Sequence, residues 1–142
     1  MKKKEQFAYL MARIAIGLSF FGHGLIRIIN LATFSQGMVK QFGKSILPAG
    51  FVSLFGHVLP FLEFITGLLL LLGLFTRFGL MLGWLILLSL IFGCSLIQEW
   101  NAIFTQLFYV AYLSVLYWFM DYNGFSMDGK RGLFRELAFS NA

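Results

Sequence analysis

The sequence predicts an all-α integral membrane protein, folded as an up-down-up-down bundle of four transmembrane helices. The first observation is composition: 59% of the 142 residues are hydrophobic and only 12% are charged, whereas soluble domains carry about 25% charged residues. The second is that the apolar residues lie in runs of spanning length, since a helix needs about 20 apolar residues to cross the hydrocarbon core. Most of this apolar surface therefore has to face lipid.

Four segments have the required length, and we assign them to a single membrane domain covering residues 1–142. The spans are approximately Phe7–Ile29, Ala49–Leu74, Arg77–Gln98 and Ala102–Tyr122, followed by a cytoplasmic tail of residues 123–142. The third and fourth spans contain long charge-free runs, whereas the first and second contain ionisable residues. Short turns join the second span to the third and the third to the fourth, so these helices are expected to pack as antiparallel neighbours.

The long connection between the first and second spans has a helical pattern of its own. Phe34, Met38 and Phe42 recur every four residues, with Lys40 and Lys44 on the opposite side. This spacing predicts a short amphipathic helix that lies at the membrane interface. Because the segment also contains glycines, a mobile loop with chance spacing is the alternative.

The distribution of basic residues predicts the orientation, because Lys and Arg are enriched on the cytoplasmic side. The amino terminus, the second turn and the tail hold seven basic residues, which are Lys2, Lys3, Lys4, Arg77, Lys130, Arg131 and Arg135. The first loop holds Lys40 and Lys44, or three basic residues if Arg27 is counted. Both termini are therefore expected in the cytoplasm.

Five ionisable residues lie inside the first two spans: Arg13, His23, Arg27, His57 and Glu63. Each costs roughly 2.5–3.5 kcal/mol on insertion scales, so such residues normally face the bundle interior and have partners. Helical geometry places the three on the first span on one side of it. Glu63 lies near the middle of the second span, and we expect it to pair with Arg13 or His23.

This buried pair has two interpretations. In the first, Glu63 and His23 handle protons together with Arg13, because a desolvated carboxyl group and a nearby imidazole can exchange protons near neutral pH. In the second, the pair is a structural ion pair that fixes how two helices pack. His57 lies about 120° around its helix from Glu63, so we expect it to hydrogen-bond locally.

Several classes of site are excluded or disfavoured. No HxxxH or ExxH spacing places two metal ligands on one helical face, so no metal is expected. The lone Cys94 cannot form an intramolecular disulfide or a CxxC pair. The basic residues form no stripe or patch, so nucleic acid is not an expected partner.

The fourth span contains polar side chains that are candidates to line a pocket for a quinone head group. These are Tyr109 and Tyr112, with Thr105 and Gln106. Arg27 and His57 are further candidates for ligand binding. Aromatic packing of the bundle core is the alternative for the two tyrosines.

The order of the unusual residues resembles the DoxX family of small bacterial membrane proteins. The matching elements are Arg13-x3-Gly17, His23-Gly24-x2-Arg27, Gly43-x4-Pro48, Glu63-x3-Gly67, Gly73-x3-Arg77 and Gly124-x-Ser126-x-Asp128. The likeness extends over nearly the whole chain. It implies a multi-pass protein of the bacterial cytoplasmic (inner) membrane.

The resemblance also implies a function. One branch of the family is similar to the large subunit of thiosulfate:quinone oxidoreductase, and other members are associated with thiol and oxidative-stress complexes. By this resemblance the chain is a subunit of a quinone-linked membrane redox or oxidative-stress complex, with a protein partner or a second copy of itself. The cofactor would be a quinone, and the catalytic candidates are Glu63, His23 and Arg13.

Two other functions are the alternatives. One is a non-catalytic membrane scaffold that recruits a partner, and a more distant one is a small-solute carrier, which the absence of an internal repeat disfavours. The interior of the bundle distinguishes the first two classes. An open cavity of ligand size lined by His23 and Glu63 would favour the oxidoreductase subunit, whereas a sealed ion pair would favour the scaffold.

Overall fold

The computed structural model describes residues 2–132, in which all the regular secondary structure is helical. The helices are α1 (Lys3–Ile29), α2 (Leu31–Gln41), α3 (Ala49–Leu72), α4 (Thr76–Leu96) and α5 (Trp100–Trp118), followed by the 3-10 turn η1 (Met120–Tyr122). Residues 127–132 are again helical, and no strand occurs within residues 2–132. The all-α prediction is therefore confirmed, while the tail beyond residue 132, with Arg135, lies outside the described residues.

Three of the helices, α1, α3 and α4, are long and apolar enough to cross a membrane. The chain is therefore a multi-pass membrane protein with surfaces that contact lipid. The predicted fourth span is also a helix, α5, but its three tyrosines and residues such as Asn101 and Gln106 make it less apolar than the other three. Four-span topology accordingly stays a prediction.

Helices α1 and α3 form an antiparallel pair that is in contact through glycines. Gly24 of α1 lies against the backbone of Phe64, and Gly67 of α3 lies against the backbone of Phe21. A Cβ atom at either glycine would overlap that backbone, so small residues permit this close approach. The two contacts fix the register of the pair, and this register places Glu63 level with the last turns of α1.

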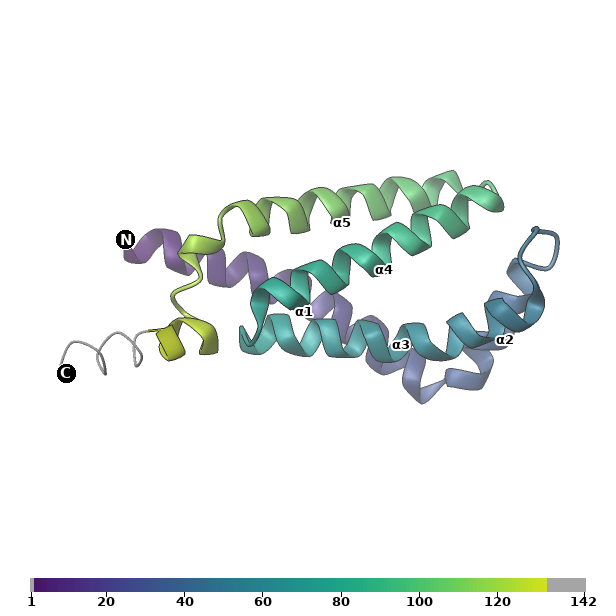
Figure 1. Cartoon of the computed structure of the whole chain (residues 1–142), viewed down its shortest axis with the longest axis horizontal. Coiled ribbons are helices and arrows are strands. Elements are labelled where there is room, and N and C mark those ends of the chain that lie inside the picture. Colours follow the sequence, from purple (N-terminus) through teal and green to yellow (C-terminus); the bar gives the residue numbers. More distant parts are fainter. Residues whose placement is uncertain (1, 133–142) are drawn as a thin grey trace.

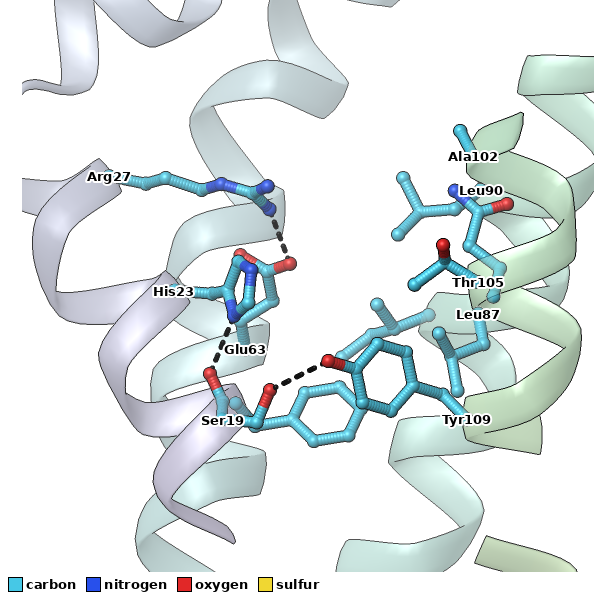
Figure 2. A pocket seen from close by; sticks show the side chains of 12 residues that line it. Ser19, His23, Arg27, Glu63, Leu87, Leu90, Ala102, Thr105 and Tyr109 are labelled. Atoms are coloured by element: carbon cyan, nitrogen blue, oxygen red, sulfur yellow. Dashed lines mark hydrogen bonds and ion pairs between the residues drawn. The ribbon is translucent and has the colours of Figure 1, made fainter. Parts of the chain in front are cut away.

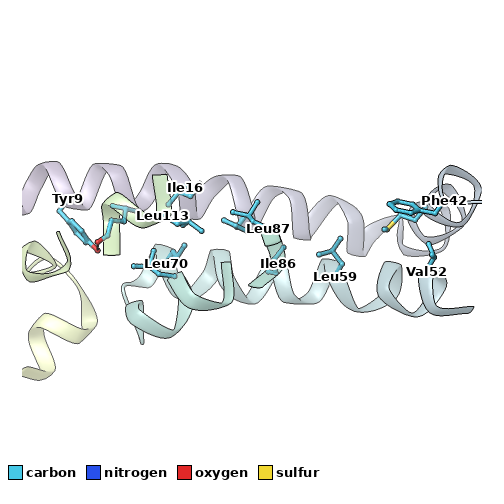
Figure 3. Packing of buried hydrophobic residues seen from close by; sticks show 13 residues of the cluster. Tyr9, Ile16, Phe42, Val52, Leu59, Leu70, Ile86, Leu87 and Leu113 are labelled. Carbon is cyan, nitrogen blue, oxygen red and sulfur yellow. Dashed lines mark hydrogen bonds between the residues drawn. The ribbon is translucent and has the colours of Figure 1, made fainter. Parts of the chain in front are cut away.

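The buried apolar side chains form a row along this helix pair, from Tyr9 at one end to Val52 and Phe42 at the other (Figure 3). Leu70 and Leu113 are completely buried within it. Many other large apolar side chains on the spanning helices point outward and are exposed. This combination is expected of a membrane protein, whose outer surface is solvated by hydrocarbon.

The short helix predicted in the first loop is confirmed as α2. It packs on α3, where Gly56 leaves room for the buried Ser35. Met38 and Phe42 are buried, as their spacing predicted, and Phe34 is half-buried. The position of α2 at the membrane interface stays a prediction.

Helices α4 and α5 form a hairpin that leans away from α3 toward the end of the molecule at which α2 lies (Figure 1). At the other end, α5 returns to the start of α1, where the Tyr9 hydroxyl donates to the Leu116 carbonyl oxygen at 2.9 Å. The beginning of α1 and residues 120–132 thus lie at the same end of the bundle (Figure 1). Which side of the membrane this end faces stays a prediction.

Candidate functional site

A cavity of about 280 Å³ lies where α1, α3, α4 and α5 meet. Figure 2 shows polar side chains of α1 and α3 facing those of α5 across it. Its polar lining consists of Ser19, His23, Arg27, Glu63, Thr105, Gln106 and Tyr109. We call this space the polar cavity.

The central interaction of the polar cavity is an ion pair between helices α1 and α3. The Arg27 guanidinium donates to Glu63 Oε1 at 2.5 Å, and the Glu63 side chain is 5% exposed against 28% for Arg27. The expectation that Glu63 pairs with Arg13 or His23 is wrong. In the register of the two antiparallel helices, Arg27 of α1 lies almost level with Glu63 of α3. The long Arg27 side chain extends along the wall of the polar cavity to the Glu63 carboxylate.

Arg13 lies at a different place in the fold. It is 1% exposed, and its Nη2 donates to the Phe125 carbonyl oxygen at 2.8 Å. Its guanidinium also lies so close to Gly73 that a Cβ atom there would overlap it. Because ten helical residues separate Arg13 from His23, the two Cα atoms are about 15 Å apart along α1. The expectation that Arg13 shares a site with Glu63 is therefore wrong.

His23 lines the polar cavity with Glu63 and has a defined orientation. Its Nδ1 lies 2.7 Å from the Ser19 carbonyl oxygen. A carbonyl oxygen only accepts, so Nδ1 carries the hydrogen and Nε2 of the neutral ring is left as the basic nitrogen. The Ser19 hydroxyl donates to the Tyr109 hydroxyl at 3.3 Å (Figure 2). Ser19 thus links α1 to α5 on one side of the cavity.

Two buried acceptors of the lining residues have no hydrogen-bond partner within the described part of the chain. They are Glu63 Oε2 and Gln106 Oε1. A buried acceptor without a partner costs about 1–3 kcal/mol. A bound molecule or water that offers O–H or N–H groups would remove this cost.

Of the other residues predicted to bind a ligand, some line the polar cavity and others make contacts elsewhere in the bundle. Tyr109 lines the polar cavity, as do Thr105 and Gln106. Tyr112 does not, because its hydroxyl donates to a backbone carbonyl oxygen of α1 at 2.8 Å. His57 also lies outside it and hydrogen-bonds the Ser53 carbonyl oxygen at 2.7 Å. The local hydrogen bond predicted for His57 is confirmed.

Sequence reasoning missed Ser19, which orients His23 and contacts Tyr109. The signal was present, because Ser19 precedes His23 by four residues and therefore lies on the same face of α1. Within residues 2–132 no group of three His, Cys, Asp or Glu side chains is placed to hold a metal ion.

A second, larger cavity of about 430 Å³ lies beside the first, between α2, α3 and α4. Its walls are mainly apolar, and we call it the apolar cavity. Four residues line both cavities: Arg27, Leu90, Ala102 and Gln106.

The chain also matches a protein-family model. The DoxX family model matches residues 8–96, which contain most of α1, all of α2 to α4 and the ion pair of Arg27 with Glu63. Helix α5, with Tyr109, lies beyond the matched residues. No curated protein and no solved structure matches the chain.

Proposed function

The chain belongs to the DoxX family, and from that premise we propose that it is a subunit of a quinone-linked redox or oxidative-stress complex in the bacterial inner membrane. The observation that carries this proposal is the polar cavity of about 280 Å³, which is lined by His23 and Glu63 between helices that are apolar on the outside. Ligand pockets begin at about 300 Å³, so this cavity, just below that bound, has room for a ring-sized head group but not for a larger ligand.

The residues of the polar cavity fit the chemistry of a quinone head group. Such a group is a flat ring with two carbonyl oxygens that accept hydrogen bonds. Arg27, Thr105 and Tyr109 are potential donors from two sides of the cavity, while Phe20 and Leu87 supply apolar wall. In the reduced form the head group carries hydroxyls, which match the unpartnered acceptors described above.

A bound quinone supplies reversible two-electron, two-proton chemistry. In this proposal His23 holds or releases a proton at Nε2, because its Nδ1 is fixed on the Ser19 carbonyl oxygen. Glu63 is the second proton-exchanging group, and Arg27 stabilises its charged form. A lone cysteine cannot act as a thiol pair, and in this proposal a partner protein supplies the electrons.

The proposal places α5 in the membrane as a fourth span with both termini in the cytoplasm. Helix α5 is charge-free over its 19 residues, and Tyr109 on it lines the same cavity as His23 and Glu63 on the spanning helices. A helix packed at that depth against the spanning helix α4 would itself meet hydrocarbon, which supports the fourth span.

The test is direct binding of a quinone to the purified protein. Native mass spectrometry of protein extracted gently from its own membrane should detect a bound quinone, and added quinone should bind to protein reconstituted in nanodiscs. We expect Glu63→Gln and His23→Ala each to weaken this binding at least tenfold. Glu99→Gln, a change of the same type at an exposed position in the α4–α5 turn, should leave it unchanged.

The scaffold alternative makes the opposite prediction. If the wild-type protein binds no quinone and copurifies only with a stoichiometric protein partner, the proposal is wrong. It is also wrong if folded Glu63→Gln protein binds quinone as tightly as the wild type, because the polar cavity would then not be the site.

A further inference from the structure

We infer that the apolar cavity receives the hydrocarbon tail of the quinone, so that the two cavities together recognise a long-chain lipid quinone. This inference rests on the proposed function, which assigns only the head group. The proposed occupant of the apolar cavity is therefore an alkyl or isoprenoid chain attached to a ring in the polar cavity.

The first argument is adjacency. Arg27, Leu90, Ala102 and Gln106 line both cavities, so the two spaces lie against each other and share these four side chains. The second space, about 430 Å³, is the larger of the two. A ligand confined to the polar cavity would leave this adjoining space without an occupant.

The second argument is the change of chemistry from one adjoining cavity to the other. The polar end carries the ion pair and the His23 ring, whereas the other end is walled by aromatic and aliphatic side chains such as Phe34, Met38, Phe42 and Leu59. Arg27 marks the boundary, because its guanidinium pairs with Glu63 on one side and lies over the Phe34 ring at 4.7 Å on the other. This is the polarity profile of a lipid with a polar ring and an apolar chain.

The third argument is access from lipid. Phe51 and Phe92 line the apolar cavity, and they are 55% and 63% exposed, respectively. Their exposed parts belong to the apolar outer surface, so the rim of this cavity faces hydrocarbon. A lipid tail can therefore enter laterally without crossing water. Because lipid is as apolar as the cavity wall, packing rather than transfer from water sets the gain in affinity.

The sole cysteine of the chain provides a reporter for the tail. Cys94 lines the apolar cavity but not the polar one, and Gln106 donates to its Sγ at 3.4 Å. A tail in the apolar cavity should cover this thiol, whereas a head group alone should not.

The experiment compares two quinones that carry no ring hydrogen: decylubiquinone, with a ten-carbon tail, and duroquinone, with none. Protein in nanodiscs is treated with N-ethylmaleimide, and the rate of Cys94 alkylation is followed by mass spectrometry. We expect decylubiquinone to slow alkylation at least fivefold and to bind about tenfold more tightly than duroquinone. Duroquinone should bind without changing the alkylation rate.

A substitution that fills the apolar cavity completes the test. A Cβ atom at Gly93, which lines this cavity, would contact the Phe42 ring at 3.4 Å, so Gly93→Leu should extend into the space. We expect it to lower the affinity for decylubiquinone to that for duroquinone, with duroquinone binding unchanged. Gly22→Leu is the matched control, because a Cβ atom at Gly22 meets open space.

The outcomes separate this inference from the proposed function. Equal affinities for the two quinones, with Cys94 unprotected, would overturn the tail site while the head-group site stands. Undiminished binding of decylubiquinone to Gly93→Leu would also overturn it. If neither quinone binds, the inference and the proposed function are both wrong.

Discussion

In the ion pair of Arg27 with Glu63, the positive charge of Arg27 compensates the negative charge of the buried Glu63 carboxylate. Glu63 is held between α1 and α3 with one oxygen on the Arg27 guanidinium, while Arg27 is partly exposed toward the cavities. A buried charge that loses its partner destabilises a protein by about 3–5 kcal/mol. The pair therefore contributes to stability as well as to the chemistry of the polar cavity.

We predict that Arg27→Met lowers the free energy of unfolding by about 2 kcal/mol, less than for a fully buried pair because 28% of the Arg27 side chain is exposed. Adding Glu63→Gln should restore at least half of the loss, since no charge is then left unpaired. Denaturation with SDS in mixed micelles measures both values. Arg77→Met, at an exposed position of α4, should cost less than about 1 kcal/mol. A double variant no more stable than Arg27→Met would contradict the prediction.

At this scale the sequence predicts which residues need partners better than it predicts the partners. The depth of Glu63 in its span identified it as a charge that must be paired. Its partner could not be chosen, because a helical wheel gives the face of Arg13, His23 and Arg27 but not the register of the two helices. Only the register of the two helices brings Arg27 beside Glu63, whereas the separation of Arg13 from His23 along α1, about 15 Å, follows from the sequence.

At the scale of the helices, glycines set that register. The antiparallel α1–α3 pair is in contact at Gly24 and Gly67, where each glycine lies on the backbone of the other helix. The helices themselves follow from the sequence, because apolar runs and the four-residue spacing of α2 predict them directly. The pairing does not, since other glycines of the spanning helices, such as Gly79 and Gly83 of α4, lie outside this interface.

We predict that Gly24→Ala forces α1 and α3 apart and lowers the free energy of unfolding by about 2 kcal/mol, as overpacking typically does. Gly22→Ala, two residues earlier on the same helix, is the control, because its Cβ atom meets open space. That variant should be at least as stable as the wild type, because alanine favours a helix more than glycine does. The same SDS titration measures both. Equal stability of the two variants would show that the helices are not in contact at Gly24.

At the scale of the whole molecule, the segment after α5 connects α1 with the start of α4. The Asp128 carboxylate accepts from the backbone N–H groups of Phe75 and Thr76, at 2.8 and 2.7 Å, and so caps the start of α4. Arg13 of α1 donates to the Phe125 carbonyl oxygen of the same segment. The sequence indicated the Gly124-x-Ser126-x-Asp128 pattern but not this role, because its partners lie about fifty residues earlier in the chain.

This arrangement predicts that Asp128→Ala loosens the segment without unfolding the bundle. The variant loses two hydrogen bonds to a charged group, each worth about 1.5–3 kcal/mol, while the contact with Arg13 remains. We expect amide hydrogen exchange in residues 123–130 to become at least tenfold faster, with α1 and α3 unchanged. Asp121→Ala, at an exposed position in the same segment, should leave exchange as in the wild type. Equal exchange in both variants would mean that Asp128 does not anchor the segment, whereas faster exchange throughout α3 and α4 would mean that the cap stabilises the whole bundle.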